Sequence, residues 1–207
     1  MMAEKPPLVP APDGIQVKDW PCSDVFSILD LVNPESVLAR QRSFHEFAPQ
    51  RNWFARPEEV VGIHGIMHEA RVMVLSDYLY RKIMKDLAEP VTTDDLLALR
   101  WSAAVHDIRR KDDCFDWKHG ERSANWALKK LAIPLDIHYQ VRHIVSWHVP
   151  DDRHAPLPPN EVDPRTNFLL ALFKDCDALD RVRSGDLDPF FLRFSRSKEL
   201  ISLAQEL

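Results

Sequence analysis

Proline is almost absent from the middle of this chain. The sequence has sixteen prolines, yet the only one between Glu58 and Ile133 is Pro90. Proline lacks an amide hydrogen and breaks helices, so a long segment without it can be helical. Apolar residues recur there at spacings of three and four, the period of a helix face, as in Met67, Ala70, Val74 and Tyr78. The sequence therefore predicts a long helix from about Ile63 to Ala88.

Helix-boundary signals predict further helices along the chain. Thr93, followed by two acidic residues, is typical of an N-cap, and Thr166 is a second candidate cap. Pro134 and Pro150 each end a helical pattern. Because no internal repeat and no alternating strand pattern occurs, we expect an all-α fold. The expected helices cover residues 93–106, 120–131, 136–148 and 166–179, and an amphipathic stretch follows from Phe190.

Scarce glycine and cysteine exclude several kinds of site. The five glycines form neither a G-x-G-x-x-G turn nor a G-x-x-x-x-G-K phosphate loop. The three cysteines are widely spaced, which argues against a disulfide framework or a thiolate zinc site. A net charge of −5 gives no strong signal for a nucleic-acid partner. Without a leader or about 18 consecutive apolar residues, we expect a cytoplasmic protein with no membrane partner.

Histidines and acids gather at the ends of the predicted helices. Imidazole and carboxylate groups together are the ligands that suit borderline divalent metals. A helical bundle can aim one or two such side chains inward from each of several helices. The pattern therefore predicts a metal site between helices. The residues that could contribute are His64, His68, His106, Asp107, His119, His143, His148, Asp175, Asp177 and Asp180.

In their order along the chain these residues resemble the HD superfamily of metal-dependent phosphohydrolases. That family has a His, then a His-Asp pair, then a distant Asp, with extra histidines between them in many members. The match extends from about Ile63 to Arg181. It rests on His68-Glu69-Ala70-Arg71-Val72, Ala103-Ala104-Val105-His106-Asp107, His119-Gly120, Trp147-His148 and Asp175-Cys176-Asp177-Ala178-Leu179-Asp180-Arg181.

The resemblance implies a single helical HD-type domain with an N-terminal extension. We expect a flexible Pro-rich tail over residues 1–15 and a helical extension over 16–62. The HD metal-binding domain is expected over 63–185, and a C-terminal helix over 186–207 is expected to pack on it. Residues 151–165, with four prolines, are expected to form a surface loop.

The resemblance also implies a ligand set. His68, His106, Asp107 and Asp177 match the ligands of a first divalent ion. His119 and His148 match the positions where two-metal members bind a second ion, with Asp107 then bridging both. The implied cofactor is one divalent ion, or two, drawn from Mn, Mg, Co, Ni, Zn and Fe.

The activity implied is hydrolysis of a small phosphate ester, such as a nucleotide, by metal-activated water. Asp107 is expected to orient or deprotonate the water. Arg71, Arg109 and Arg110 are candidates for neutralising the phosphate, because the guanidinium fork fits phosphate oxygens. Nothing after His148 matches the Gly-Tyr-Pro extension of the cyclic-dinucleotide phosphodiesterases, which argues against cyclic-di-GMP as the substrate.

Two other functions fit the same residues. Some HD-fold proteins hold two irons and oxidise a small polyol or phosphonate, and the histidine-rich set is compatible with that chemistry. A non-catalytic, metal-binding regulatory module is the other alternative.

Several residues also have ordinary structural interpretations. His64 is equally compatible with a capping role, and His143 is expected to be structural. Cys176, Trp101 and Trp126 are expected in the core. Trp117 or Trp147 is expected to wall a pocket, and His45, His138 and His154 are expected at the surface.

Overall fold

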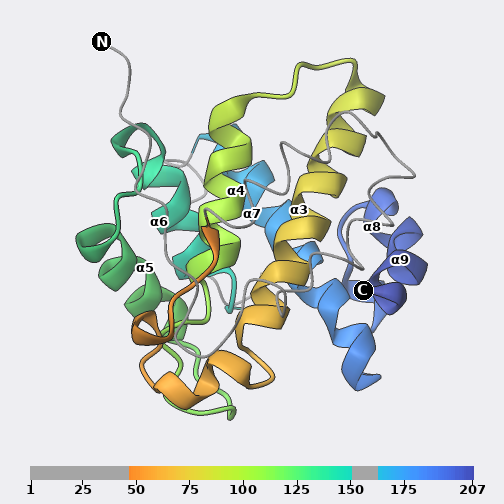
Figure 1. Ribbon diagram of the computed structural model, residues 1–207. Coiled ribbons are helices and arrows are strands. Elements are labelled where there is room, and N and C mark those ends of the chain that lie inside the picture. The colour runs from red at the N-terminus through yellow and green to blue at the C-terminus, as the bar shows by residue number, and fades with distance from the viewer. Residues whose placement is uncertain (1–46, 151–162) are drawn as a thin grey trace.

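The computed structural model describes residues 47–150 and 163–207, and these residues form an all-α fold without a strand, as predicted (Figure 1). The α-helices are α3 (Ile66–Leu87), α4 (Thr93–Val105), α5 (His119–Lys130), α6 (His138–Trp147), α7 (Pro164–Leu179), α8 (Ser195–Glu199) and α9 (Ile201–Glu206). Short 3-10 turns are η3 (Arg51–Trp53), η4 (Pro57–Val61), η5 (Leu135–Ile137), η6 (Asp180–Ser184) and η7 (Pro189–Phe191).

Helices α3, α4 and α7 form the centre of the molecule. In Figure 1 the α5–α6 pair lies on one side of them and α8–α9 lies on the other. At one end of the three helices, Tyr80 donates a hydrogen bond to Asp95, with 2.7 Å between Oη and Oδ2, and Arg165 binds the same carboxylate. At the other end, His68 of α3 faces His106, which follows α4. The polar ends therefore fix how α3 and α4 align. Trp101 and Cys176 are buried in the core, as predicted.

The helix caps differ from two of the predictions. Thr92, and not Thr93, caps α4, because its hydroxyl accepts a hydrogen bond from the amide of Asp95 at 3.3 Å. Asp163, and not Thr166, caps α7, because the carboxylate accepts from the amide of Thr166 itself at 3.0 Å. Proline at position 164 then occupies the first turn of α7, where a missing amide hydrogen costs nothing.

The prediction of one C-terminal helix over residues 186–207 is wrong. The segment contains the turn η7 and the two short helices α8 and α9. Asp175 of α7 accepts hydrogen bonds from the backbone amides of Arg193 and Phe194, which holds this part of the segment extended. Leu200 is buried against the core, as expected of packing on the domain, whereas Phe190 is exposed.

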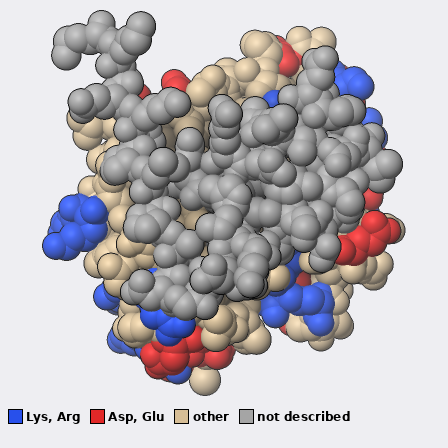
Figure 2. All heavy atoms as spheres, viewed as in Figure 1, with Lys and Arg blue, Asp and Glu red and all other residues tan. Residues whose placement is uncertain are grey.

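Some predictions fall outside the described residues. They are the tail over 1–15, most of the extension over 16–62, and most of the loop over 151–165. His45 and His154 also lie there. Within the described ranges no helix is long and apolar enough to cross a membrane. On the face drawn in Figure 2, the coloured acidic and basic atoms are interspersed around the grey region, so neither sign of charge dominates the visible part.

We predict that Asp175→Ala destabilises the protein by about 3 kcal/mol, because it removes a buried carboxylate and leaves buried donors without an acceptor. Asp175 is fully buried and also accepts from the Ser197 hydroxyl at 2.7 Å. Urea unfolding followed by circular dichroism measures the change. The matched control is Asp136→Ala on the exposed side of η5, which should change stability by less than about 0.5 kcal/mol. Equal stability of the two variants would show that Asp175 does not stabilise the fold through these hydrogen bonds.

Candidate metal centre

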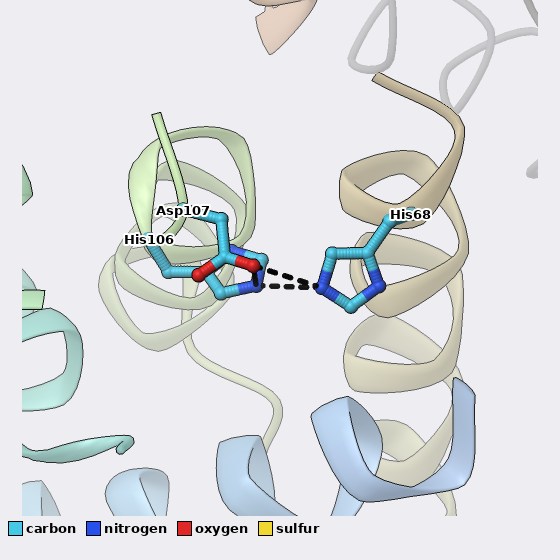
Figure 3. A group of neighbouring side chains, drawn as sticks. All are labelled: His68, His106 and Asp107. Atoms are coloured by element: carbon cyan, nitrogen blue, oxygen red, sulfur yellow. Dashed lines mark hydrogen bonds and ion pairs between the residues drawn. The ribbon is translucent and has the colours of Figure 1, made fainter. Parts of the chain in front are cut away.

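Four of the predicted ligands converge where α3, α4 and α7 meet. Figure 3 shows His68 reaching from α3 toward His106 and Asp107 at the end of α4. The two Nε2 atoms of His68 and His106 are 3.0 Å apart, and Asp107 Oδ2 is 3.6 Å from His68 Nε2. Asp177 of α7 completes this first ligand group, with its Oδ1 atom 3.3 Å from His68 Nε2 and 3.7 Å from His106 Nε2.

A second ligand group lies on the other side of Asp107. His119 is the first residue of α5, and His148 directly follows α6. Their Nε2 atoms are 3.0 Å apart, and they lie 2.7 and 3.6 Å from Asp107 Oδ1. Asp107 therefore offers Oδ2 to the first group and Oδ1 to the second. The carboxylate is placed to bridge two cations, and all the residues of both groups are buried except Asp177, whose side chain is 30% exposed.

The outer nitrogens of the four histidines are already bound, which leaves their inner nitrogens available. Nδ1 of His106 donates to the Ala103 carbonyl at 2.9 Å, and Nδ1 of His148 donates to the Val145 carbonyl at 2.7 Å. Nδ1 of His119 likewise donates to a backbone carbonyl, and Nδ1 of His68 donates to a carboxylate. In the neutral rings each Nε2 atom is then a lone-pair acceptor.

These close acceptor pairs fit metal ions. Two facing lone pairs at 3.0 Å repel each other unless a cation or a proton lies between them. In addition, the Oδ1 atom of Asp107 is buried and accepts no hydrogen bond from the described residues. A divalent ion would satisfy both features, because it takes nitrogen and oxygen donors together.

The electrostatic field of the site also favours bound cations. Burial raises the pKa of Asp107, but the positive field of the surrounding histidines outweighs it and holds that pKa well below its usual range. Burial lowers the pKa of His68, yet the neighbouring carboxylates of Asp177 and Asp180 raise it to about 10. Burial lowers the pKa of His148 to about 4, which keeps that ring neutral and able to donate a lone pair. The first group therefore attracts positive charge, and the second includes the neutral imidazole of His148.

Asp180 has a role that the sequence did not reveal. Its Oδ2 atom is 2.7 Å from His68 Nδ1, and it also binds the guanidinium groups of Arg71 and Arg183. Such a carboxylate behind a ligand histidine fixes the ring and increases its basicity. The spacing of Asp177 and Asp180, three residues apart at the end of one helix, is the signal that could have shown both facing α3.

All of the ligands except His106 line a cavity of about 1380 Å³. Cationic side chains from several elements line it, and so do both tryptophans that the sequence offered as walls. Arg110 lies next to the ligands, with Nη1 3.7 Å from Asp107 Oδ1. The lining includes His64, Arg110, Trp117, Trp147, Lys174, Arg181, Arg183 and Arg193.

The structure does not bring Arg71 and Arg109 to this cavity. Arg71 binds Asp180, behind the first ligand group. Arg109 donates to the Trp53 carbonyl at 3.1 Å and lies over the ring of Trp126. Of the three predicted arginines, only Arg110 is among the described residues that line the cavity.

The remaining histidines separate into different environments. His64 lines the cavity and its Nδ1 atom is 3.0 Å from Asp113 Oδ1. His143 is buried against Asn167, outside the cavity, which fits the structural role expected of it. His138 is half-buried against the Ile133 carbonyl and is not a fully exposed surface residue.

We predict that Gly120→Ala disrupts the second ligand group and leaves the first intact. A Cβ atom at position 120 would lie 2.2 Å from the Val145 carbonyl oxygen and 3.0 Å from the His148 ring, so α5 and α6 must separate. The variant should lose about 2 kcal/mol of stability and bind fewer metal ions, as measured by urea unfolding and by metal analysis after dialysis. The neighbouring substitution Glu121→Ala, on the exposed face of α5, is the control. Wild-type stability and metal content in Gly120→Ala would refute this packing.

We predict that Asp180→Asn weakens metal binding at the first ligand group roughly tenfold to a hundredfold, because the His68 ring loses its charged acceptor. Competition with a chromophoric chelator measures the affinity. Asp186→Asn is the control, because Asp186 also lines the cavity but pairs with Arg181 and not with a ligand. Equal affinities of the two variants would show that Asp180 does not support the site.

The centre therefore consists of buried imidazole and carboxylate donors, and within the described ranges these form two groups that can each hold a metal ion. Several divalent metals satisfy this donor chemistry. Comparison with protein-family models, with curated proteins and with solved structures gives no match.

Proposed function

We propose that the chain is an HD-type, divalent-metal-dependent phosphohydrolase that acts on a small phosphate ester such as a nucleotide. The observation that carries the proposal is the shared carboxylate of Asp107. It joins two ligand groups whose residues, except His106, line a cavity that also contains cationic side chains. Anion binding and metal binding in one cavity are the two requirements of phosphoryl transfer to water.

The two ligand groups would hold the ions differently. The first group offers four protein donors, from His68, His106, Asp107 and Asp177. The second offers three, from Asp107, His119 and His148, which leaves coordination positions for a water molecule or a substrate oxygen. Bound divalent ions supply an activated water near neutral pH and neutralise charge on phosphoryl oxygens.

The chain's own residues supply the remaining functions. Asp107, held ionised between the histidines, would orient the attacking water. The guanidinium of Arg110, next to Asp107 and at the cavity wall, would donate hydrogen bonds to the phosphate. Arg71 would act indirectly, because it holds the Asp180 carboxylate that orients His68.

The di-iron oxygenase remains the second candidate. The observation that favours it is the histidine-rich second group, because nitrogen donors from His119 and His148 also suit iron. The two functions differ in the metal that is bound and in the product that is formed. Metal analysis and a product assay on one preparation of the protein therefore distinguish them.

Metal removal tests the proposed function. Protein purified without added metal is analysed for bound metal, treated with EDTA, and assayed for phosphate release from nucleotides and simple phosphate esters. We expect EDTA to abolish release and Mn²⁺, Co²⁺, Ni²⁺ or Mg²⁺ to restore it. Stoichiometric iron with no phosphate release in Mn²⁺ would instead favour the oxygenase.

Substitution of the shared ligand gives an independent prediction. Asp107→Ala should lower kcat by at least about a hundredfold, because both ligand groups lose their common donor and the water loses the carboxylate that orients it. Asp136→Ala, on the exposed side of η5, is the control and should retain wild-type kcat. Full activity in Asp107→Ala would contradict a catalytic role for the centre.

A further inference from the structure

Four exposed aromatic side chains line the same cavity as the ligand groups. Phe115 and Trp117 come from the loop between α4 and α5, and Phe190 and Phe191 come from η7. The exposed fractions are 87% for Phe115, 56% for Trp117, 82% for Phe190 and 65% for Phe191. We call these four residues the aromatic rim. Large apolar side chains gathered at this exposure mark a binding surface more often than single exposed residues do.

Hydrogen bonds to backbone amides hold the η7 turn, which carries two of these rings. The side chain of Asp188 accepts a hydrogen bond from the amide of Phe190 at 2.9 Å, which closes the turn. The next residues are fixed by Asp175, whose carboxylate accepts from the amides of Arg193 and Phe194 at 2.9 and 3.0 Å. The rings of Phe190 and Phe191 lie 5.6 Å apart at 86°. The η7 turn therefore presents two differently oriented aromatic surfaces from a tethered support.

The helix that holds the η7 segment, α7, also carries one of the candidate metal ligands. Asp175 holds the η7 segment, and Asp177, two residues later on α7, belongs to the first ligand group. The cavity of about 1380 Å³ is also larger than the roughly 300–1000 Å³ typical of small-ligand pockets. The cavity therefore has room for a phosphate at the ligand groups and for a second group at the rim.

We propose that the aromatic rim binds a planar ring on the substrate, so that the enzyme prefers phosphate esters that carry an aromatic base over esters of a bare sugar. This inference rests on the proposed function. The two parts of the substrate would bind at different places. Arg110 lies next to the ligands, where the phosphate would bind, whereas the rim offers aromatic faces to the ring. Aromatic side chains bind bases by stacking, and this contact tolerates different bases because each has a π-face.

The test uses two ligands that differ only in the ring. They are the phosphonate isosteres of adenosine 5′-monophosphate and of ribose 5-phosphate, in which a CH₂ group replaces the bridging oxygen and prevents hydrolysis. Calorimetry with the metal-loaded protein, without oxygen, measures both affinities. We expect the adenosine compound to bind roughly tenfold more tightly, the magnitude of one stacked base.

Variants of the rim assign the preference to its residues. The double substitution Phe190→Ala with Phe191→Ala should remove most of the tenfold difference, and the double substitution to Leu should give an intermediate value because it keeps apolar area without the ring. Tyr139→Ala is the matched control, because Tyr139 is an exposed aromatic residue of α6 that does not line the cavity. It should leave the preference unchanged.

The outcomes separate this inference from the proposed function. Equal affinity for the two ligands, or a preference that survives the double alanine substitution, overturns the inference. Loss of thermal stability in that variant with the ligand preference intact also overturns it, and indicates that the rings cover another part of the chain or a partner. Phosphate release from the two natural esters is measured in parallel. Equal kcat/KM values for the two esters would support the phosphohydrolase activity but not the role of the aromatic rim. Tighter binding of the adenosine compound without release of phosphate from either ester would support the role of the rim and contradict the phosphohydrolase activity.

Discussion

The shared carboxylate of Asp107 is the interaction on which the rest of the site depends. One of its oxygens faces His68, and the other faces His119 and His148. A buried charge is costly unless it is paired, and here four imidazoles surround it while their own outer nitrogens are bound elsewhere. The protein thereby fixes the Nε2 atoms of the four rings toward the carboxylate. That preorganisation distinguishes the arrangement from an ordinary buried ion pair, and it explains why a metal centre is the chemistry that fits.

Helix termini deliver most of these ligands. His106 follows the last residue of α4, His119 is the first residue of α5 and His148 follows the last residue of α6. Near a helix end the ring can bond a carbonyl of its own terminal turn, as Nδ1 of His106 does with Ala103 and Nδ1 of His148 does with Val145. The close approach of α5 and α6 at Gly120 then places His119 beside His148. Local backbone geometry and helix packing together set the positions of the donors.

Helix α7 connects the metal centre to the mouth of the cavity. Asp177 and Asp180 serve the first ligand group, one as a donor and the other as the acceptor behind His68. Asp175 instead binds the backbone that follows η7. Of three acids within six residues, one is thus a ligand, one orients a ligand, and one fixes a wall of the cavity. The sequence shows the spacing of the three acids. Which partner each acid contacts depends on how α7 packs against its neighbours.

Local sequence patterns were sufficient to predict the helical class, the approximate helix boundaries and the set of residues that could bind metal. Proline position and apolar period are local properties, so they predicted α3 to within a few residues. Local signals are less specific for caps, because the neighbouring Thr92 and Thr93 differ only in which hydroxyl reaches the amide of Asp95. They also could not separate Arg110 from Arg109, since adjacent residues point in different directions and only packing decides that one lines the cavity while the other lies over Trp126. Helix packing makes Asp107 a shared residue and places Asp180 behind His68. It also brings the residues of η7 and the loop before α5 to the lining of one cavity. These are contacts between residues far apart in sequence, and no local pattern encodes them.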